Sequence, residues 1–210
     1  KLKKFLLVKD EKNEQNYLMK SINNYVVFFW SMFKQIYCKF LKIEEFAYET
    51  DEYGRNLLHL LARHGSISML KLALEKLKSE LSHEDFHNFI HLKSEYDQNI
   101  MHHAVWNKNQ ESVEFLVNFI KNEVRSKIFK KMLIDVDCYN CLPLYSAIKS
   151  NSFEVFEPFF SLYDQNFTKA ELLVIFQLKD DNGDNFLDLA FHNREILVKI
   201  DAIKIVNWFE

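Results

Sequence analysis

The fold is decided by the stretch Asp51-Glu-Tyr-Gly-Arg-Asn-Leu-Leu-His-Leu-Leu-Ala-Arg-His-Gly65. Its first nine residues return every 43 residues without a gap in register. The later copies are Ser94-Glu-Tyr-Asp-Gln-Asn-Ile-Met-His102, Asp137-Cys-Tyr-Asn-Cys-Leu-Pro-Leu-Tyr145 and Asp180-Asp-Asn-Gly-Asp-Asn-Phe-Leu-Asp188. Self-similarity at a fixed period is the signature of an architecture in which each unit buries its apolar face against its neighbours. We therefore predict a solenoid.

Apolar columns carry the repeat beyond these motifs. The eighth position of each motif is held by Leu58, Met101, Leu144 and Leu187. A second set of columns contains Phe86, Phe129 and Leu172, then Phe89, Met132 and Ile175. In this part of the unit Ser82 precedes Asp85 by three residues, and Thr168 precedes Glu171 by three, which is a helix N-cap pattern. Each unit should therefore carry an extra short helix with an apolar face.

Composition narrows the fold class and the partners. Only 3 Gly and 2 Pro occur in 210 residues, so turn-rich sandwiches, barrels and Gly-rich phosphate loops are disfavoured and the chain should be all-α. The 27 basic and 30 acidic residues give a net charge of −3 with no basic block, which argues against a nucleic-acid partner. No apolar run approaches the roughly 20 residues of a membrane span. Three cysteines cannot all pair within the chain, which favours a reducing, intracellular and cytoplasmic setting.

The segment from Asp51 to Gly65 resembles the ankyrin repeat, in which a β-turn leads into a short helix and then a second, antiparallel helix. The resemblance implies an ankyrin-like α-solenoid of about five helix-turn-helix units with short β-turn or hairpin loops. The family period is about 33 residues, so the extra helix accounts for the excess here. The chain departs from the pattern at Asp97 and Lys108, where Gly is usual, and at Tyr145 and Asp188, where His is usual.

The register divides the chain into units of one solenoid domain spanning 1–210. We expect a degenerate N-terminal repeat at 1–50, repeats at 51–93, 94–136 and 137–179, and an incomplete C-terminal repeat at 180–210. The chain lacks an initiator Met and stops inside an apolar pattern, so we expect further repeats or domains in the parent chain. Self-association through the C-terminal apolar segment containing Ile205, Val206, Trp208 and Phe209 is an open alternative.

The resemblance implies a function for the concave face formed by the turns and first helices, which binds a protein partner in this family. Carried onto this chain residue by residue, the partner-facing positions are Tyr53, Arg55, Arg63, His64, Tyr96, Gln98, Trp106, Asn107, Tyr139, Lys149, Asn182 and His192. Tyr53, Tyr96 and Tyr139 should form a ladder, and such aromatic side chains are frequent binding hot spots. The alternative is that these tyrosines only pack between neighbouring turns. His59 and His102 match a family histidine that hydrogen-bonds the turn backbone.

Two motifs suggest chemistry. His83-Glu84-Asp85-Phe86-His87 matches the H-E-x-x-H pattern of zinc proteases, but it lies in a helix that recurs in every unit and has no third ligand at a family spacing. Cys138-Tyr-Asn-Cys141 is a lone C-x-x-C in the turn column, either two turn residues or a redox-sensitive turn. We expect no catalytic residue, metal or cofactor.

The sequence therefore predicts a non-catalytic interaction scaffold. The alternative is a substrate- or host-target-recruiting ankyrin region of a larger enzyme, toxin, effector or receptor. A zinc hydrolase that uses His83, Glu84 and His87 is a remote third hypothesis.

Overall fold

The computed structural model describes residues 47–107, 109–193 and 196–197. These residues form ten α-helices and contain no β-strand, which confirms the all-α prediction. The predicted degenerate repeat at 1–50 lies almost wholly outside the described residues, as does the apolar C-terminal segment that includes Trp208.

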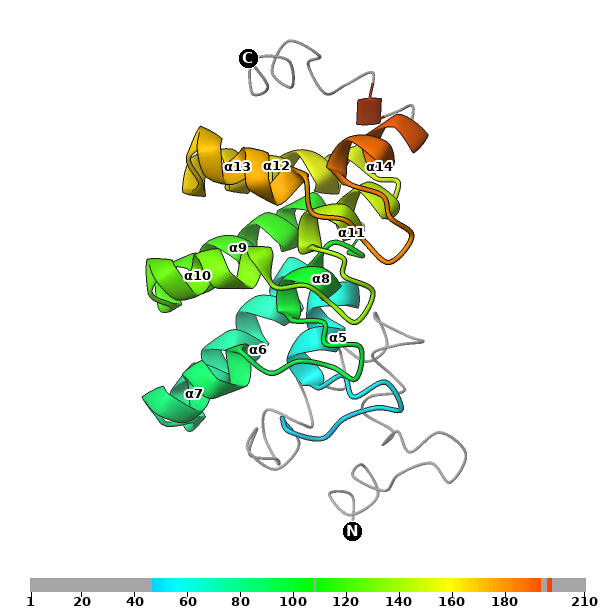
Figure 1. The fold of residues 1–210 in the computed structure, drawn as a ribbon. Helices are drawn as coiled ribbons and strands as arrows, with labels where there is room; N and C mark the ends of the chain where they lie inside the picture. Colours follow the sequence, from blue (N-terminus) through cyan, green and yellow to red (C-terminus); the bar gives the residue numbers. More distant parts are fainter. Residues whose placement is uncertain (1–46, 108, 194–195, 198–210) are drawn as a thin grey trace.

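Each complete unit consists of three helices. The first unit contains α5 (Leu57–His64), α6 (Ile67–Glu80) and α7 (His83–Ile90). The next two contain α8 (Ile100–Ala104), α9 (Gln110–Glu123) and α10 (Ser126–Ile134), then α11 (Pro143–Lys149), α12 (Phe153–Asn166) and α13 (Lys169–Phe176), and the fourth begins with α14 (Phe186–His192). Figure 1 shows the units stacked in sequence order, with α5, α8, α11 and α14 in one layer and α6, α9 and α12 in the other. Helices α7, α10 and α13 lie at the opposite end of the units from the turns.

Local sequence fixes where these helices begin. Asn56 and Asn99 cap α5 and α8, and each forms a capping box with the histidine three residues later. Helix α11 has no side-chain cap and starts instead with Pro143, which suits the first turn because it lacks the N–H that would go unpaired there. The predicted caps Ser82 and Thr168 are confirmed, since each hydroxyl accepts a hydrogen bond from the backbone N–H three residues on.

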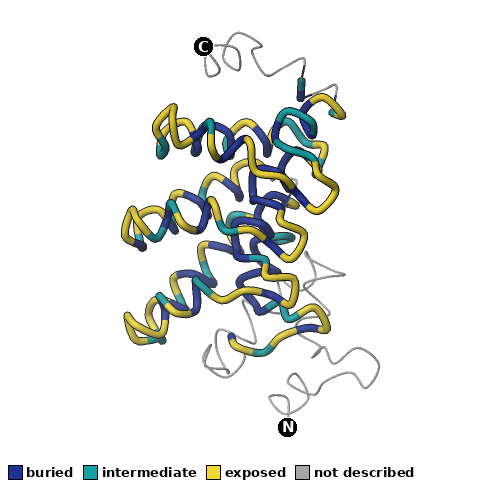
Figure 2. The backbone as a smooth tube through the Cα atoms, viewed as in Figure 1, coloured by how far each residue is buried: buried dark blue, intermediate teal, exposed yellow. Residues whose placement is uncertain are grey.

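The predicted apolar columns form one continuous core. All six residues of the extra-helix columns named above are buried, so these helices dock on their neighbours. Figure 2 shows the buried backbone running along the inner sides of the two helix layers, with the turn tips exposed. Phe160, Phe176 and Phe186 stack on one another, with ring centroids 4.3 to 6.5 Å apart, and join the third unit to the fourth. Burial of such columns across each junction is the main stabilising contribution in a repeat stack.

The departure from Gly at Asp97 does not change the turn, whereas Lys108 lies outside the described residues. Asp97 and Asn140 adopt φ of 56° and 54°, close to the 65° of Gly54 at the same position of the first unit. Asp and Asn tolerate this left-handed region better than other non-glycine residues. Each turn also closes with the same pair of backbone hydrogen bonds, from Asp97 N to the Ser94 carbonyl and from Ser94 N to the Gln98 carbonyl in the second unit.

Candidate functional site

The turns are tied to one another along the stack. Glu95 N donates to the Tyr53 carbonyl at 3.0 Å, Cys138 N to the Tyr96 carbonyl at 2.9 Å, and Asp181 N to the Tyr139 carbonyl at 3.1 Å. The tyrosine rings follow the same spacing, with centroids 6.3 Å apart between Tyr53 and Tyr96 and 6.1 Å apart between Tyr96 and Tyr139. The predicted ladder is therefore confirmed as an arrangement.

The ladder rings contact one another and still face solvent. Tyr53, Tyr96 and Tyr139 are 40%, 38% and 51% exposed. Packing between turns and availability to a partner are therefore not exclusive for these side chains. Backbone hydrogen bonds between the turns and contacts between the rings together hold these exposed aromatic side chains in place.

Carboxylates hold three of the four turns. The Asp51 Oδ1 atom accepts hydrogen bonds from the backbone N–H groups of Tyr53 and Arg55, and Asp137 and Asp180 accept the equivalent pairs in their own turns. The second turn has Ser94 at this position, which is buried but cannot carry a charge. Because of this one difference between the repeats, the surface at the junction of the first and second turns lacks the acidic group that the other turns have.

His103 lies beneath this surface. Its Nε2 atom is 3.3 Å from the Ser94 hydroxyl, and its ring centroid is 4.8 Å from that of His59. Within the described part of the chain, the buried Nδ1 atom has no hydrogen-bond partner. Burial, and then the charges of the neighbouring His59, Arg63 and Arg55, lower the pKa of His103, so the ring is neutral.

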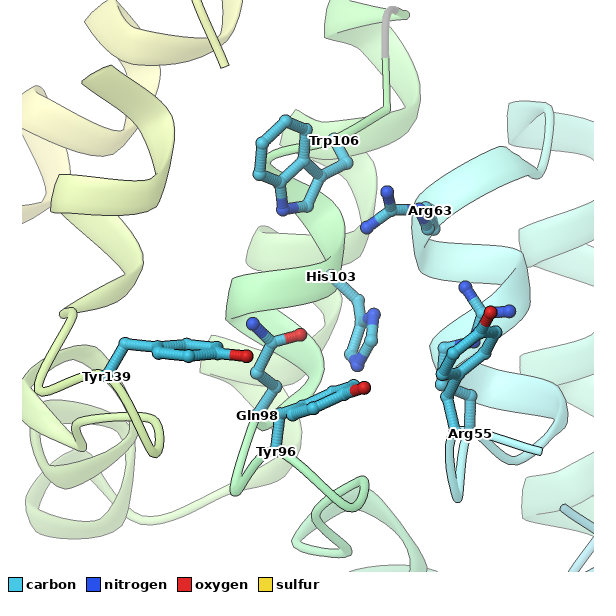
Figure 3. Close-up of a pocket in the computed structure, with 8 residues that line it drawn as sticks. Arg55, Arg63, Tyr96, Gln98, His103, Trp106 and Tyr139 are labelled. Atoms are coloured by element: carbon cyan, nitrogen blue, oxygen red, sulfur yellow. The ribbon is translucent and has the colours of Figure 1, made fainter. Parts of the chain in front are cut away.

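A hollow of about 420 Å³ lies above His103 and is lined by residues of the first three turns and of the helices that follow the first two. Its described lining residues are Tyr53, Arg55, Arg63, Tyr96, Gln98, His103, Trp106 and Tyr139. In Figure 3 the His103 ring lies between the Tyr96 ring and the Arg63 guanidinium, with Trp106 at the far rim. No acidic residue is among the described residues that line it.

The two arginines of the hollow differ in their partners. Arg55 lies over the Tyr53 ring and is paired with Asp51 through two nitrogens, at 2.7 and 2.6 Å. Arg63 lies 5.1 Å from the centre of the Trp106 ring, and it makes no ion pair with any described residue. Burial, and then the charge of Arg55, lower the pKa of the Arg63 guanidinium. Of the two arginines, Arg63 is thus the one whose positive charge is not neutralised by a described carboxylate.

Seven of the twelve predicted partner-facing residues line this one hollow: Tyr53, Arg55, Arg63, Tyr96, Gln98, Trp106 and Tyr139. His64 lines an adjoining hollow with Arg63 and Trp106, and burial lowers its pKa to about 4. Asn182 and His192 are exposed in the fourth unit, away from the hollow.

The expectation for Asn107 needs correction. This residue is only 5% exposed, and its Nδ2 atom donates to the carbonyls of Ala62 and Gly65 in the preceding unit. Its Oδ1 atom accepts a hydrogen bond from Asn109 N. Both N–H groups of the amide are therefore used within the fold, where the side chain joins two repeats.

Sequence reasoning missed His103 because the preceding histidine fills the family position. The available signal was its column, in which the other units have Leu60, Ser146 and Leu189. A histidine at a position that is otherwise apolar or small indicates a buried polar group with a specific role.

Lys149 has a partner within the fold. Its Nζ atom lies 2.7 Å from the Asp180 carboxylate and 2.9 Å from the Cys141 sulfur. Cys138 is exposed, Cys141 is buried, and both are free thiols. Burial raises the pKa of the Cys141 thiol, and residual desolvation together with the carboxylates of Asp137 and Asp97 raises that of the exposed Cys138, which disfavours the thiolate that disulfide exchange requires.

The H-E-x-x-H motif lies on α7, where its first three residues are exposed, Phe86 is buried and His87 is partly exposed. The His83 and His87 rings are tilted by 35° to one another, with their centroids 4.4 Å apart. Across residues 47–107, 109–193 and 196–197, no cluster of three or more His, Cys, Asp or Glu side chains is placed to hold a metal ion.

A family model described as ankyrin repeats, in three copies, matches residues 3–128, which is more than half of the chain. No curated protein matches this chain. None of the helices in the described part is both long and apolar enough to cross a membrane.

Proposed function

This chain belongs to the ankyrin repeat family, and we propose that it is a non-catalytic module that binds a protein partner on its ladder face. The ladder face comprises the tyrosine ladder (Tyr53, Tyr96 and Tyr139) together with Arg55, Arg63, Gln98 and Trp106. Ankyrin repeats are in general modules of protein–protein interaction.

The observation that carries the proposal is the fixed, exposed tyrosine ladder. Tyr and Trp bury a large area at a small cost in rotamer entropy, and for this reason they dominate binding hot spots. The bonds between turns already fix the backbone of the ladder, so a partner would not have to order it on binding. Trp106 extends the aromatic area to the rim of the hollow.

The first experiment is an affinity capture with quantitative mass spectrometry, followed by titration of the purified partner. It compares the unmodified chain with a variant carrying Tyr53→Ala, Tyr96→Ala and Trp106→Ala. A matched control carries Ile134→Ala and Val174→Ala, which remove exposed apolar side chains from α10 and α13, away from the ladder face. Circular dichroism checks that all three chains are folded.

We expect one partner to bind the unmodified chain and the control with equal affinity. Its affinity for the ladder variant should be lower by a factor of at least about 30. Equal binding to all three folded chains would place the interaction elsewhere. Capture of no partner by the unmodified chain would contradict the interaction role itself.

A further inference from the structure

We propose that the hollow above His103 is a carboxylate-binding site, in which one Asp or Glu side chain of the protein partner binds Arg63, the cation whose counterpart carboxylate is replaced by Ser94 in this repeat. This inference rests on the proposed function and specifies the chemistry of the partner.

The third and fourth units show what the missing acid would do. Lys149 lies twelve residues after the turn acid Asp137, and it pairs with Asp180, the turn acid of the next unit, at 2.7 Å. In the first unit Arg63 lies twelve residues after Asp51, and the equivalent partner in the next unit is Ser94. The repeat therefore places a cation at Arg63 and withholds the carboxylate that would neutralise it.

Two groups at the hollow lack a polar partner among the described residues. Arg63 is paired with no carboxylate among the described residues, although it is only partly exposed beside Trp106. The Nδ1 atom of His103 is buried and has no partner in the same part of the chain. If Nε2 accepts the proton of the Ser94 hydroxyl, the neutral ring carries its own proton on Nδ1 as a donor. Buried polar groups are normally satisfied, so an unmet pair of this kind indicates a ligand.

The charge balance favours a carboxylate over a phosphate. Arg55 is already neutralised by Asp51, which leaves one cation, Arg63, for a ligand of a single negative charge. A guanidinium fork matches the two oxygens of a carboxylate. The aromatic rim of Tyr96 and Trp106 can cover the apolar stem of the side chain and exclude water, which strengthens the ion pair.

A double-mutant cycle on stability tests, without any ligand, whether Arg63 pairs with a carboxylate placed at position 94. Ser94→Asp supplies the missing carboxylate and should raise Tm by about 2–4 °C. An added Asp can also accept hydrogen bonds from its own turn, as Asp51 does, so the same substitution is made in an Arg63→Met background. A smaller rise in that background assigns the difference to the pair with Arg63. Equal rises in both backgrounds would show that Arg63 does not recognise a carboxylate at this place.

A peptide-display selection tests the ligand. Random peptides are selected on the unmodified chain, and the winners are titrated against Ser94→Asp, Arg63→Met and the control Val174→Ala. We expect winners with an Asp or Glu at one fixed position, binding the unmodified chain and the control equally. Affinity should fall about tenfold or more in Ser94→Asp, which fills the site from within, in Arg63→Met, and when the peptide's acid is changed to its amide.

Further peptides identify the source of the charge. Tighter binding of a peptide with phosphoserine at the acidic position would overturn the carboxylate assignment in favour of phosphate. Loss of binding on amidation of the peptide C-terminus, with no effect of the internal acid, would overturn the side-chain assignment.

The failures of the two proposals are distinguishable. Winners without an acid that still depend on Tyr53, Tyr96 and Trp106 would overturn the carboxylate site and leave the ladder face in place. Winners that bind the variant lacking these three rings as well as they bind the unmodified chain would contradict the ladder face itself.

Discussion

The first two described repeats and the last two reach the same fold with different residues. Residues 51–128 lie within the range matched by the family model, whereas 137–193 lie outside it. In the first unit the Nε2 atom of His59 bonds the Leu92 carbonyl, just before the next turn. In the third unit the hydroxyl of Tyr145 bonds the carbonyl of Leu178, which is the equivalent position. In these two units the hydrogen bond to that connection is kept although the donor changes, whereas in the second unit the Nε2 atom of His102 lies 3.0 Å from the Cys141 carbonyl in the turn itself.

The two halves differ more at the surface between turns. The third and fourth units are closed by the ion pair of Lys149 with Asp180. The first and second have Arg63 and Ser94 at these positions, and Arg63 lines the hollow instead of pairing with a described carboxylate. One junction of the stack thus carries a cation without the acid that its counterpart pairs with at another junction, while the described helices keep their places.

The largest expected difference between the first two repeats and the last two is in how much stability they lose at acidic pH. Burial lowers the pKa of His59 to about 4, against about 6.5 in an unfolded chain, and the pKa of His102 is also lowered by burial. Between these values the unfolded state binds a proton that the folded state refuses, so stability falls as pH drops from 6.5 towards 4. His59 alone should cost about 2 kcal/mol at pH 5. Burial raises the pKa of Tyr145, so the third unit has no such loss in this range.

Hydrogen exchange with mass spectrometry at pH 7 and pH 5 measures this difference. After correction for intrinsic exchange rates, amides of α5 and α8 should lose more protection than those of α11 and α12. Equal loss in both pairs of helices would contradict a histidine origin.

Two glycines at the same turn position compare the first junction with the fourth turn. Gly54 and Gly183 both have positive φ, which costs an alanine about 1–2 kcal/mol. A Cβ atom at Gly54 would also lie 2.8 Å from the backbone N of Glu95, whereas one at Gly183 meets nothing within 4 Å. Gly54→Ala should therefore destabilise the chain by about 1 kcal/mol more than Gly183→Ala, because a backbone contact cannot rotate away. Urea unfolding of the two variants checks the order, and a larger cost at Gly183 would contradict it.

The helices could be predicted from sequence because burial and capping are local or periodic. Apolar columns at a fixed spacing determine which faces are buried, and Ser82 and Thr168 show their role by the acidic residue three positions later. The ladder could be predicted for the same reason, since a 43-residue register places Tyr53, Tyr96 and Tyr139 in line.

The hollow could not be predicted in the same way. It depends on which side chains meet across a junction, and the relation of Arg63 to Ser94 is recognisable only from the observed pair of Lys149 with Asp180. The inward orientation of Asn107 likewise depends on the carbonyls that the preceding helix leaves unpaired at its end. The column of each residue predicts its place in the unit, but its partner lies in another unit.

Replacement of Tyr145 tests whether its hydroxyl substitutes for the histidine. Tyr145→Phe removes the donor to the Ile175 and Leu178 carbonyls and should cost about 1–2 kcal/mol in unfolding free energy. Tyr145→His restores a donor of the type found at His59 and should recover part of this loss at pH 7. It should also make the third unit sensitive to acid, which pH-dependent thermal unfolding can measure. A Phe variant as stable as the unmodified chain would show that the bond is not needed.

The smallest expected effect is the difference in stability between removing Lys149, which is paired with Asp180, and removing Arg63, which has no such pair in the described part of the chain. Lys149→Met removes the pair with Asp180 and should cost about 0.5–1 kcal/mol at pH 7, since the lysine is partly exposed. Arg63→Met should cost less, because it removes no ion pair among the described residues. Burial acts to raise the pKa of Asp180, but hydrogen bonds from Lys149 and the turn N–H groups outweigh it and hold this pKa below its usual value. The contribution of the pair is therefore complete at neutral pH and is lost as pH falls below about 4, through the folded pKa of Asp180. Urea unfolding at pH 7 and pH 3 measures these losses of unfolding free energy. The loss caused by Lys149→Met should be smaller at pH 3 than at pH 7, and that caused by Arg63→Met should be the same at both. Equal losses for the two variants at pH 7 would mean that the ion pair of Lys149 with Asp180 contributes no stability.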